Sequence, residues 1–143
     1  MGRVIEGKIV IPGAVRGVAI VTNEPLSFWG GYDHQSGEIT DRRHPLSGQN
    51  AAGKILVVPF SRGSSTTTAV LLEAIREHTA PLAILTTSID TFFALASIVA
   101  DEMYDRPIPI LAIEPEDAGY IESGDKLLIE LDGTIRILLA VDH

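Results

Sequence analysis

The sequence of 143 residues contains no cysteine. The chain can therefore form no disulfide bond, build no thiolate zinc site and ligate no iron–sulfur cluster. The sequence also shows no spacing of His, Asp and Glu that predicts another metal site. Any such cofactor that the activity requires must be held by another chain.

Long apolar runs are also missing. No run approaches the ~20 residues that a helix needs to cross a bilayer. The first residues, 1–6, lack the apolar centre of a signal peptide. We therefore expect a cytoplasmic protein with no membrane partner.

Basic residues are few: 11 Lys and Arg stand against 19 Asp and Glu, which gives a net charge of −8. An acidic surface repels polyphosphate backbones, so a nucleic acid is not an expected partner. Basic side chains do gather locally at Arg42, Arg43 and His44, and Arg62 stands beside a glycine. A small anion can be bound at either place.

The composition is that of an ordinary globular protein, with 45% hydrophobic and 21% charged residues. A chain of this length buries roughly 68–70% of the surface that it exposes when unfolded, so packing alone can stabilise it. We expect a single domain over residues 1–143.

Alternating and β-branched patterns mark both ends of the chain. Residues 4–10 and 15–21 are predicted as two strands joined by a turn, which would form a hairpin. Residues 126–131 and 134–140 flank Asp132-Gly133, a strong hairpin signal. We therefore expect a hairpin at each end.

The middle of the chain alternates strand and helix patterns. Residues 54–60, 82–86 and 108–113 are apolar runs typical of buried strands. Residues 64–78 carry one apolar stripe, as an amphipathic helix does. With the two hairpins, this order predicts an α/β domain of three layers, sheet on sheet on helix.

A second helix is predicted over residues 89–104, with Ser88 as its cap. Its centre, residues 92–100, is apolar nearly all round, and such a helix must be buried all round. In a domain this small, that pattern indicates that one side of the helix meets a second chain.

The segment from Arg62 to Thr66 lies between a predicted strand and a helix N-terminus. The unpaired N–H groups and the dipole of a first helical turn stabilise an alkoxide or a bound carboxylate, and Gly63 allows close approach of a ligand. On spacing alone, a helix cap at Ser64 or Ser65 is the more ordinary interpretation. Arg62 could equally be a solvated side chain.

A second candidate feature is the loop over residues 26–34, which contains Trp29 and the pair Gly30-Gly31. A loop this apolar is costly to expose, so it packs inward, covers a ligand or meets a partner. The sequence leaves an inward-packed loop and a site-forming loop equally open.

Taken together, these features resemble the small subunit, or swivel domain, of the aconitase X family. The resemblance covers nearly the whole chain and is most specific in Ser27-Phe28-Trp29-Gly30-Gly31 together with Gly63-Ser64-Ser65. It implies a swivelling β/β/α fold that docks on a large, cysteine-bearing subunit with an iron–sulfur cluster. The active site would lie in the cleft between the two subunits.

The resemblance also implies roles for individual residues. In aconitases a Gly-Ser-Ser-Arg turn supplies the base as its first serine, which is Ser64 here, and Ser65 would contact the substrate. The third place holds Thr66 in this chain, which argues against a tricarboxylate. The other residues expected to contact a small carboxylate substrate are Arg62, Gly63, Ser27, Trp29, Gly30, Gly31 and His44.

Two dehydrations are associated with this family, of cis-3-hydroxy-L-proline in bacterial members and of 5-phosphomevalonate in archaeal ones. The Phe-Trp-Gly-Gly and Arg-Gly-Ser-Ser segments are similar to the bacterial group, so hydroxyproline is the preferred substrate. The chain is expected to be inactive without its large subunit.

Two other classes of function use the same residues. A swivelling phosphohistidine carrier would be phosphorylated on His44. A serine hydrolase would use Ser64, His44 and Asp41, although the sequence has no Gly-x-Ser-x-Gly elbow.

Overall fold

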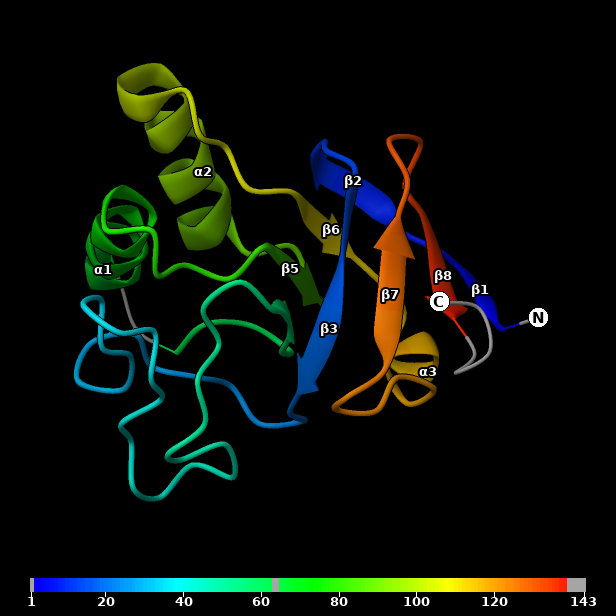
Figure 1. Ribbon diagram of the computed structural model, residues 1–143, viewed down its shortest axis with the longest axis horizontal. Helices are drawn as coiled ribbons and strands as arrows, with labels where there is room; N and C mark the ends of the chain where they lie inside the picture. The colour runs from blue at the N-terminus through cyan, green and yellow to red at the C-terminus, as the bar shows by residue number, and fades with distance from the viewer. Residues whose placement is uncertain (1, 63–64, 139–143) are drawn as a thin grey trace.

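The computed structural model describes residues 2–62 and 65–138. Figure 1 shows how its helices and strands are arranged. The strands are β1 (Val4–Glu6), β2 (Lys8–Ile11), β3 (Val15–Val21), β4 (Ile55–Val57), β5 (Ala83–Thr86), β6 (Ile110–Ala112), β7 (Lys126–Ile129) and β8 (Thr134–Leu138). The helices are α1 (Ser65–Arg76), α2 (Thr91–Tyr104) and the short α3 (Pro115–Ala118).

The described strands form one sheet in the order β1-β8-β7-β3-β4-β5-β6-β2. Strand β3 joins its two halves, because it pairs antiparallel with β7 and parallel with β4. Figure 1 shows α1 and α2 on one side, the mainly parallel half in the middle, and the antiparallel half on the other side. This arrangement confirms the predicted three-layer α/β fold.

Two apolar cores hold the three layers together. Leu56 of β4 faces the core under the helices, which also contains Leu71 of α1 and Phe93 of α2. Its neighbours Ile55 and Val57 face the second core, between the two halves of the sheet. Because the side chains of a strand alternate between faces, a run buried on both sides must be apolar throughout.

The predicted hairpin at the N-terminal end is wrong. The described strands β2 and β3 pair with other strands: β2 with β6, and β3 with β4 and β7. The chain changes sheet half at Gly7, whose N–H donates to the Gly133 carbonyl at 2.9 Å. A Cβ on Gly7 would lie 2.9 Å from that oxygen, so the crossing needs a residue without a side chain.

The hairpin at the C-terminal end is confirmed. Strands β7 and β8 pair antiparallel, and Gly133 in the connecting turn has a φ of 95°. The second predicted helix is also present as α2. Within residues 2–62 and 65–138, no helix is long and apolar enough to cross a membrane.

Candidate functional site

The loop over residues 26–34 and the turn after β4 lie side by side. Leu26 and Ser61 form an isolated parallel bridge, and the Arg62 N–H donates to the Leu26 carbonyl at 2.9 Å. The two segments that the sequence marks as candidate site features are therefore brought together. Gly63 and Ser64, which follow Arg62, lie outside the described residues, so their roles stay predictions.

A buried carboxylate that the sequence analysis missed lies beside this turn. Asp90 is 6% exposed, and its Oδ2 accepts hydrogen bonds from the backbone N–H and the hydroxyl of Ser61, at 2.6 and 2.7 Å. Its Oδ1 accepts from the N–H groups of Phe92 and Phe93, each at 3.0 Å. Asp90 thus joins Ser61, in the turn after β4, to the start of α2.

These bonds correct the predicted cap of α2. Asp90 has extended backbone angles and caps the helix, whereas Ser88 donates its hydroxyl to the Pro59 carbonyl at 3.4 Å. Both residue types cap helices well, so the sequence alone does not separate them. The structure decides between them, because α2 begins at Thr91, directly after Asp90.

Thr67 and Thr68, in the first turn of α1, face the interior of the protein and helix α2. Thr67 is fully buried, and its hydroxyl has no hydrogen-bond partner among residues 2–62 and 65–138. The Thr68 hydroxyl donates to the Phe92 carbonyl at 2.9 Å and so ties the start of α1 to the start of α2. Ser65, the first residue of the helix, is exposed.

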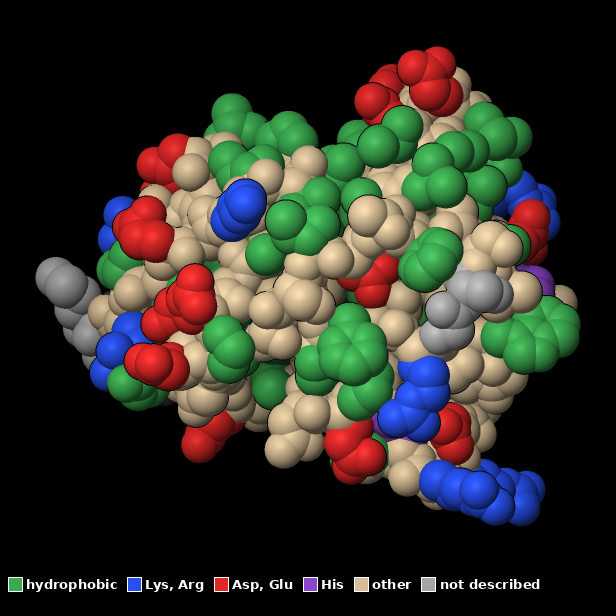
Figure 2. Space-filling model, turned by 180° about the vertical axis from the view of Figure 1, so that it is seen from behind, with side chains coloured by type: hydrophobic (Ala, Val, Ile, Leu, Met, Phe, Trp, Pro, Cys, Tyr) green, Lys and Arg blue, Asp and Glu red, His purple; other side chains and the backbone are tan. Residues whose placement is uncertain are grey.

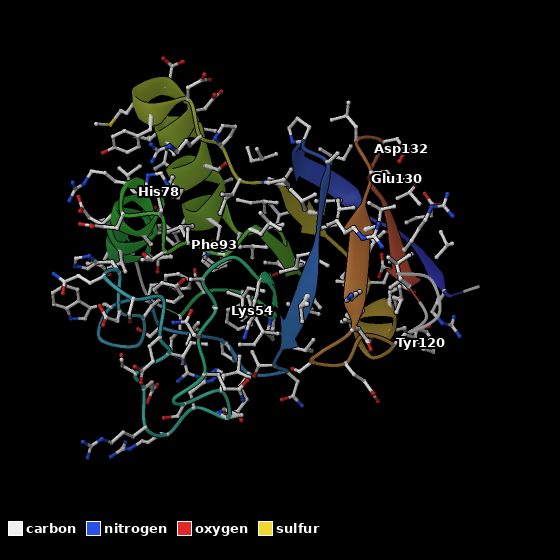
Figure 3. The ribbon with its side chains drawn as sticks, in the orientation of Figure 1. Lys54, His78, Phe93, Tyr120, Glu130 and Asp132 are labelled. Carbon is white, nitrogen blue, oxygen red and sulfur yellow. The ribbon has the colours of Figure 1, made fainter. Side chains whose placement is uncertain are left out.

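Half of the aromatic loop packs inward. Phe28 is fully buried, stacks on Tyr32 with ring centroids 4.7 Å apart, and meets Phe93 edge-on at 5.3 Å. Figure 3 labels Phe93 at the end of α2 nearest this loop. The Tyr32 hydroxyl donates to the Thr79 carbonyl at 2.7 Å, and burial raises the pKa of Tyr32.

The other half of the loop faces outward. Trp29 is 72% exposed, and its carbonyl accepts a hydrogen bond from the Ser27 hydroxyl at 3.1 Å. Gly30 has a φ of +74°, and a Cβ on Gly31 would lie 2.0 Å from the Ser27 carbonyl oxygen. The glycine pair is therefore required by this tight turn, which presents Trp29 on the surface.

A charged hollow of about 480 Å³ opens beside Arg62. The fold brings Arg62 to the same hollow as Arg42 and Arg43, which the sequence marks as separate basic places. Three guanidinium groups against two carboxylates favour a small anion. Its lining residues are Glu24, Pro25, Asp41, Arg42, Arg43, His44 and Arg62.

His44 forms part of the wall of this hollow. It is 7% exposed; its Nδ1 accepts from the Leu46 N–H at 3.1 Å, and its Nε2 lies 3.4 Å from the Glu24 carbonyl oxygen. A phosphohistidine carrier or a serine hydrolase needs an accessible ring nitrogen on this residue. The observed contacts leave His44 poorly placed for either role.

Two other places in the described residues were candidates for a site. A hollow of about 570 Å³ lies at the ends of β3 and β4 beside α3, but none of its lining side chains is charged, so it does not suit a carboxylate. One nitrogen or oxygen atom of each of His34, Glu73 and Glu77 lies within 4.8 Å of the others, a grouping that the sequence analysis did not foresee. Arg76 binds both carboxylates, at 2.8 and 3.0 Å, and holds the pKa of Glu73 below its usual value.

Comparison with known proteins identifies the fold. The family model of the aconitase X swivel domain matches residues 4–137. The chain belongs to this family. A crystal structure of aconitase X from Thermococcus kodakaraensis, in its holo form, superposes with a TM-score of 0.86 and 32% identity, covering 96% of this chain and 100% of that one.

Curated relatives fall into two groups. The cis-3-hydroxy-L-proline dehydratase of Pseudomonas aeruginosa is 42% identical over 109 residues, which are 76% of this chain and 19% of the relative. The phosphomevalonate dehydratase small subunit of Methanothermobacter thermautotrophicus is 34% identical over 119 residues, 82% of this chain and 91% of the relative. The chain thus spans about a fifth of the length of the hydroxyproline dehydratase.

Proposed function

We propose that this aconitase X swivel domain is the small subunit of a hydro-lyase that dehydrates a β-hydroxy acid, with Ser64 as the base. The observation that carries the proposal is the family match over residues 4–137, joined to the position of Ser64 directly before α1. The charged hollow beside Arg62 supports an acidic substrate.

The reaction removes a proton from the carbon next to a carboxylate and a hydroxide from the neighbouring carbon, so it needs a base and an electrophile. Ser64 takes the proton, and the positive end of the α1 dipole stabilises its alkoxide. Arg62 adds a positive charge and holds the carboxylate of the substrate. Ser65, on the exposed first turn of α1, contacts the substrate.

The electrophile must come from outside these 143 residues. Because the sequence has no cysteine, its residues do not suit an iron–sulfur cluster, which we assign to a large, cysteine-bearing subunit. Several relatives are named small subunits, which supports such a partner. The isolated chain is then inactive, since it holds one half of the active site.

The preferred substrate is cis-3-hydroxy-L-proline. The hydroxyproline dehydratase of Pseudomonas aeruginosa shares 42% of residues with the matched part of this chain, against 34% and 33% for two phosphomevalonate dehydratase small subunits. Phosphomevalonate is the second candidate. Relatives of that kind match over 90% to 97% of their own length, and the arginines of the hollow could bind a phosphate.

The test is an assay of the assembled enzyme. The chain is co-expressed with the aconitase X large subunit of the same organism, and kcat/KM is measured for both substrates under anaerobic conditions. We expect hydroxyproline to be dehydrated with the higher kcat/KM, and each subunit alone to be inactive. Preference for phosphomevalonate would select the second candidate, and no turnover of either substrate would refute the proposed function.

A further inference from the structure

Asp90 is the only Asp or Glu among residues 2–62 and 65–138 that is buried. The other acidic side chains of these residues lie at least partly on the surface, as Figure 2 shows for one face of the molecule. A carboxylate is rarely buried unless it is hydrogen-bonded throughout, because it gives up its contacts with water. The burial of Asp90 therefore depends on the four hydrogen bonds that it accepts.

The two oxygens of Asp90 bind two different segments of the chain. Oδ1 accepts from the N–H groups of Phe92 and Phe93, which is all that a helix cap requires. Oδ2 accepts from the N–H and the hydroxyl of Ser61, and so holds the turn after β4. A carboxylate only accepts, and each of its oxygens has room for two bonds, so it suits all four donors. An amide would present an NH₂ group to one of the two segments.

The first turn of α1 and the aromatic loop are tied to the same place. The Thr68 hydroxyl donates to the Phe92 carbonyl at 2.9 Å. Phe93 meets Phe28 of the loop edge-on, with ring centroids 5.3 Å apart. The start of α2 therefore contacts the turn after β4, the first turn of α1 and the loop over residues 26–34.

We propose that Asp90 is the positioning residue for the base, Ser64. This inference rests on the proposed function. In the sequence, Ser64 follows Ser61 by three residues and precedes Thr68 by four, so the chain on each side of it is tied to the start of α2. Asp90 makes the first tie itself, and it supports the second because it caps the helix whose Phe92 carbonyl accepts from Thr68.

The chemistry makes such positioning matter. A base works only within hydrogen-bond reach of the proton that it takes. A displacement of about 1 Å, caused by a change away from the reacting atoms, can lower the rate about 10²-fold. Asp90 touches no reacting atom in this account and acts through the turn that precedes Ser64.

A purely structural role for Asp90 predicts a different result. Loss of stability lowers the fraction of folded protein, but it does not change kcat for the complexes that remain folded and assembled. Loss of positioning lowers kcat for every assembled complex. The value of kcat per intact complex therefore separates the two roles.

The experiment compares Asp90→Asn with a destabilising control elsewhere. Ile135→Val shortens a fully buried side chain in the second core, which contains no residue of α1 or α2. Each variant is co-purified with the large subunit. For each intact complex, kcat and KM are measured with cis-3-hydroxy-L-proline, well below the unfolding temperature. If the wild-type complex uses phosphomevalonate instead, the same comparison is made with that substrate.

Thr68 supplies a matched pair of variants. Thr68→Val removes the hydroxyl that donates to the Phe92 carbonyl but keeps a side chain of similar size. Thr68→Ser keeps the hydroxyl. A difference in kcat between these two variants therefore reports the second tie, and the serine variant shows whether the hydroxyl alone restores it.

We expect Asp90→Asn to lower kcat per complex about 10-fold to 100-fold and to change KM by less than about threefold. Thr68→Val should lower kcat about threefold to tenfold, whereas Thr68→Ser and Ile135→Val should keep it within about twofold. Wild-type kcat in Asp90→Asn and Thr68→Val would overturn the inference and leave the proposed function standing. An equal fall in Ile135→Val would also overturn it, since kcat would then follow stability.

Two further outcomes are decisive. If Asp90→Asn does not assemble with the large subunit, the Thr68 pair decides, and equal kcat in Thr68→Val and Thr68→Ser overturns the inference. If the wild-type complex assembles but dehydrates neither substrate, the proposed function fails and the positioning role fails with it.

Discussion

Asp90 and Ser61 are joined by two short hydrogen bonds, because one carboxylate oxygen accepts from both the backbone N–H and the hydroxyl of Ser61, at 2.6 and 2.7 Å. The other oxygen caps α2. A single buried side chain therefore ties the turn after β4 to the start of α2. The residues proposed to do chemistry start at the next position, Arg62.

Replacing Asp90 by Asn tests this relationship. The amide can still cap α2 with its oxygen, but its NH₂ group would face the N–H of Ser61, leaving a buried donor unpaired. We expect the free energy of unfolding to fall by about 1–3 kcal/mol, measured by urea denaturation. Ser61→Ala is the control, since it removes the hydroxyl bond alone and should cost about 1 kcal/mol. An Asp90→Asn protein as stable as the wild type would contradict this role.

Phe28 and Trp29 are adjacent residues with opposite surroundings. Phe28→Ala should lower the free energy of unfolding by about 3–5 kcal/mol, because it empties a fully buried site. Trp29→Ala should change it by less than about 0.5 kcal/mol, because this side chain is 72% exposed. Equal destabilisation by the two substitutions, in thermal and urea unfolding, would show that Trp29 is not a surface residue.

Tyr32 makes stability depend on pH in the alkaline range. Burial raises the pKa of its hydroxyl above the ordinary value of 10.0, so the folded state favours the neutral form. The resulting stabilisation is fully present below about pH 10 and is lost as the pH rises further, by at most about 1.4 kcal/mol per pH unit.

The measurement is the free energy of unfolding at pH 8 and pH 11 for the wild type and Tyr32→Phe. The variant loses the hydrogen bond to Thr79, so it should be less stable at pH 8. It should also lose less stability between the two pH values than the wild type does. Parallel losses in both proteins would refute the role of Tyr32 in this pH dependence.

Local patterns predicted the central part of the fold well. The strand predicted over residues 54–60 contains β4, which is shorter and spans Ile55–Val57, and the amphipathic pattern of residues 64–78 became α1 within two residues at each end. The Asp132-Gly133 turn formed as predicted. These elements depend on residues that are close in the sequence, where periodicity and turn chemistry carry the information.

Elements decided by distant residues were not predictable. Strand β2 pairs with β6, about 100 positions further along the chain, and no local turn pattern in the sequence indicates this pairing. Asp90 escaped notice because its partner Ser61 is 29 positions away. A detectable signal was missed at α3, where Pro115 followed by Glu116 and Asp117 is a recognisable helix start.

The candidate site, like the fold, was predictable from the sequence only in part. The sequence identified Arg62, Trp29 and the glycine pair from their residue types, and the fold shows that these segments meet. The burial of His44, and the contacts of both its ring nitrogens, depend on Glu24 and Leu46. Only the three-dimensional arrangement could therefore weaken the interpretations that need a reactive histidine.

Substitution of Ser64 in the assembled complex tests the account most directly. We predict that Ser64→Ala binds the large subunit with wild-type affinity while kcat for hydroxyproline dehydration falls about 10²–10⁴-fold, the usual loss when a general base is removed. Ser65→Ala, the neighbouring control, should act mainly on KM. A Ser64→Ala complex that assembles normally and retains full turnover would contradict the central claim.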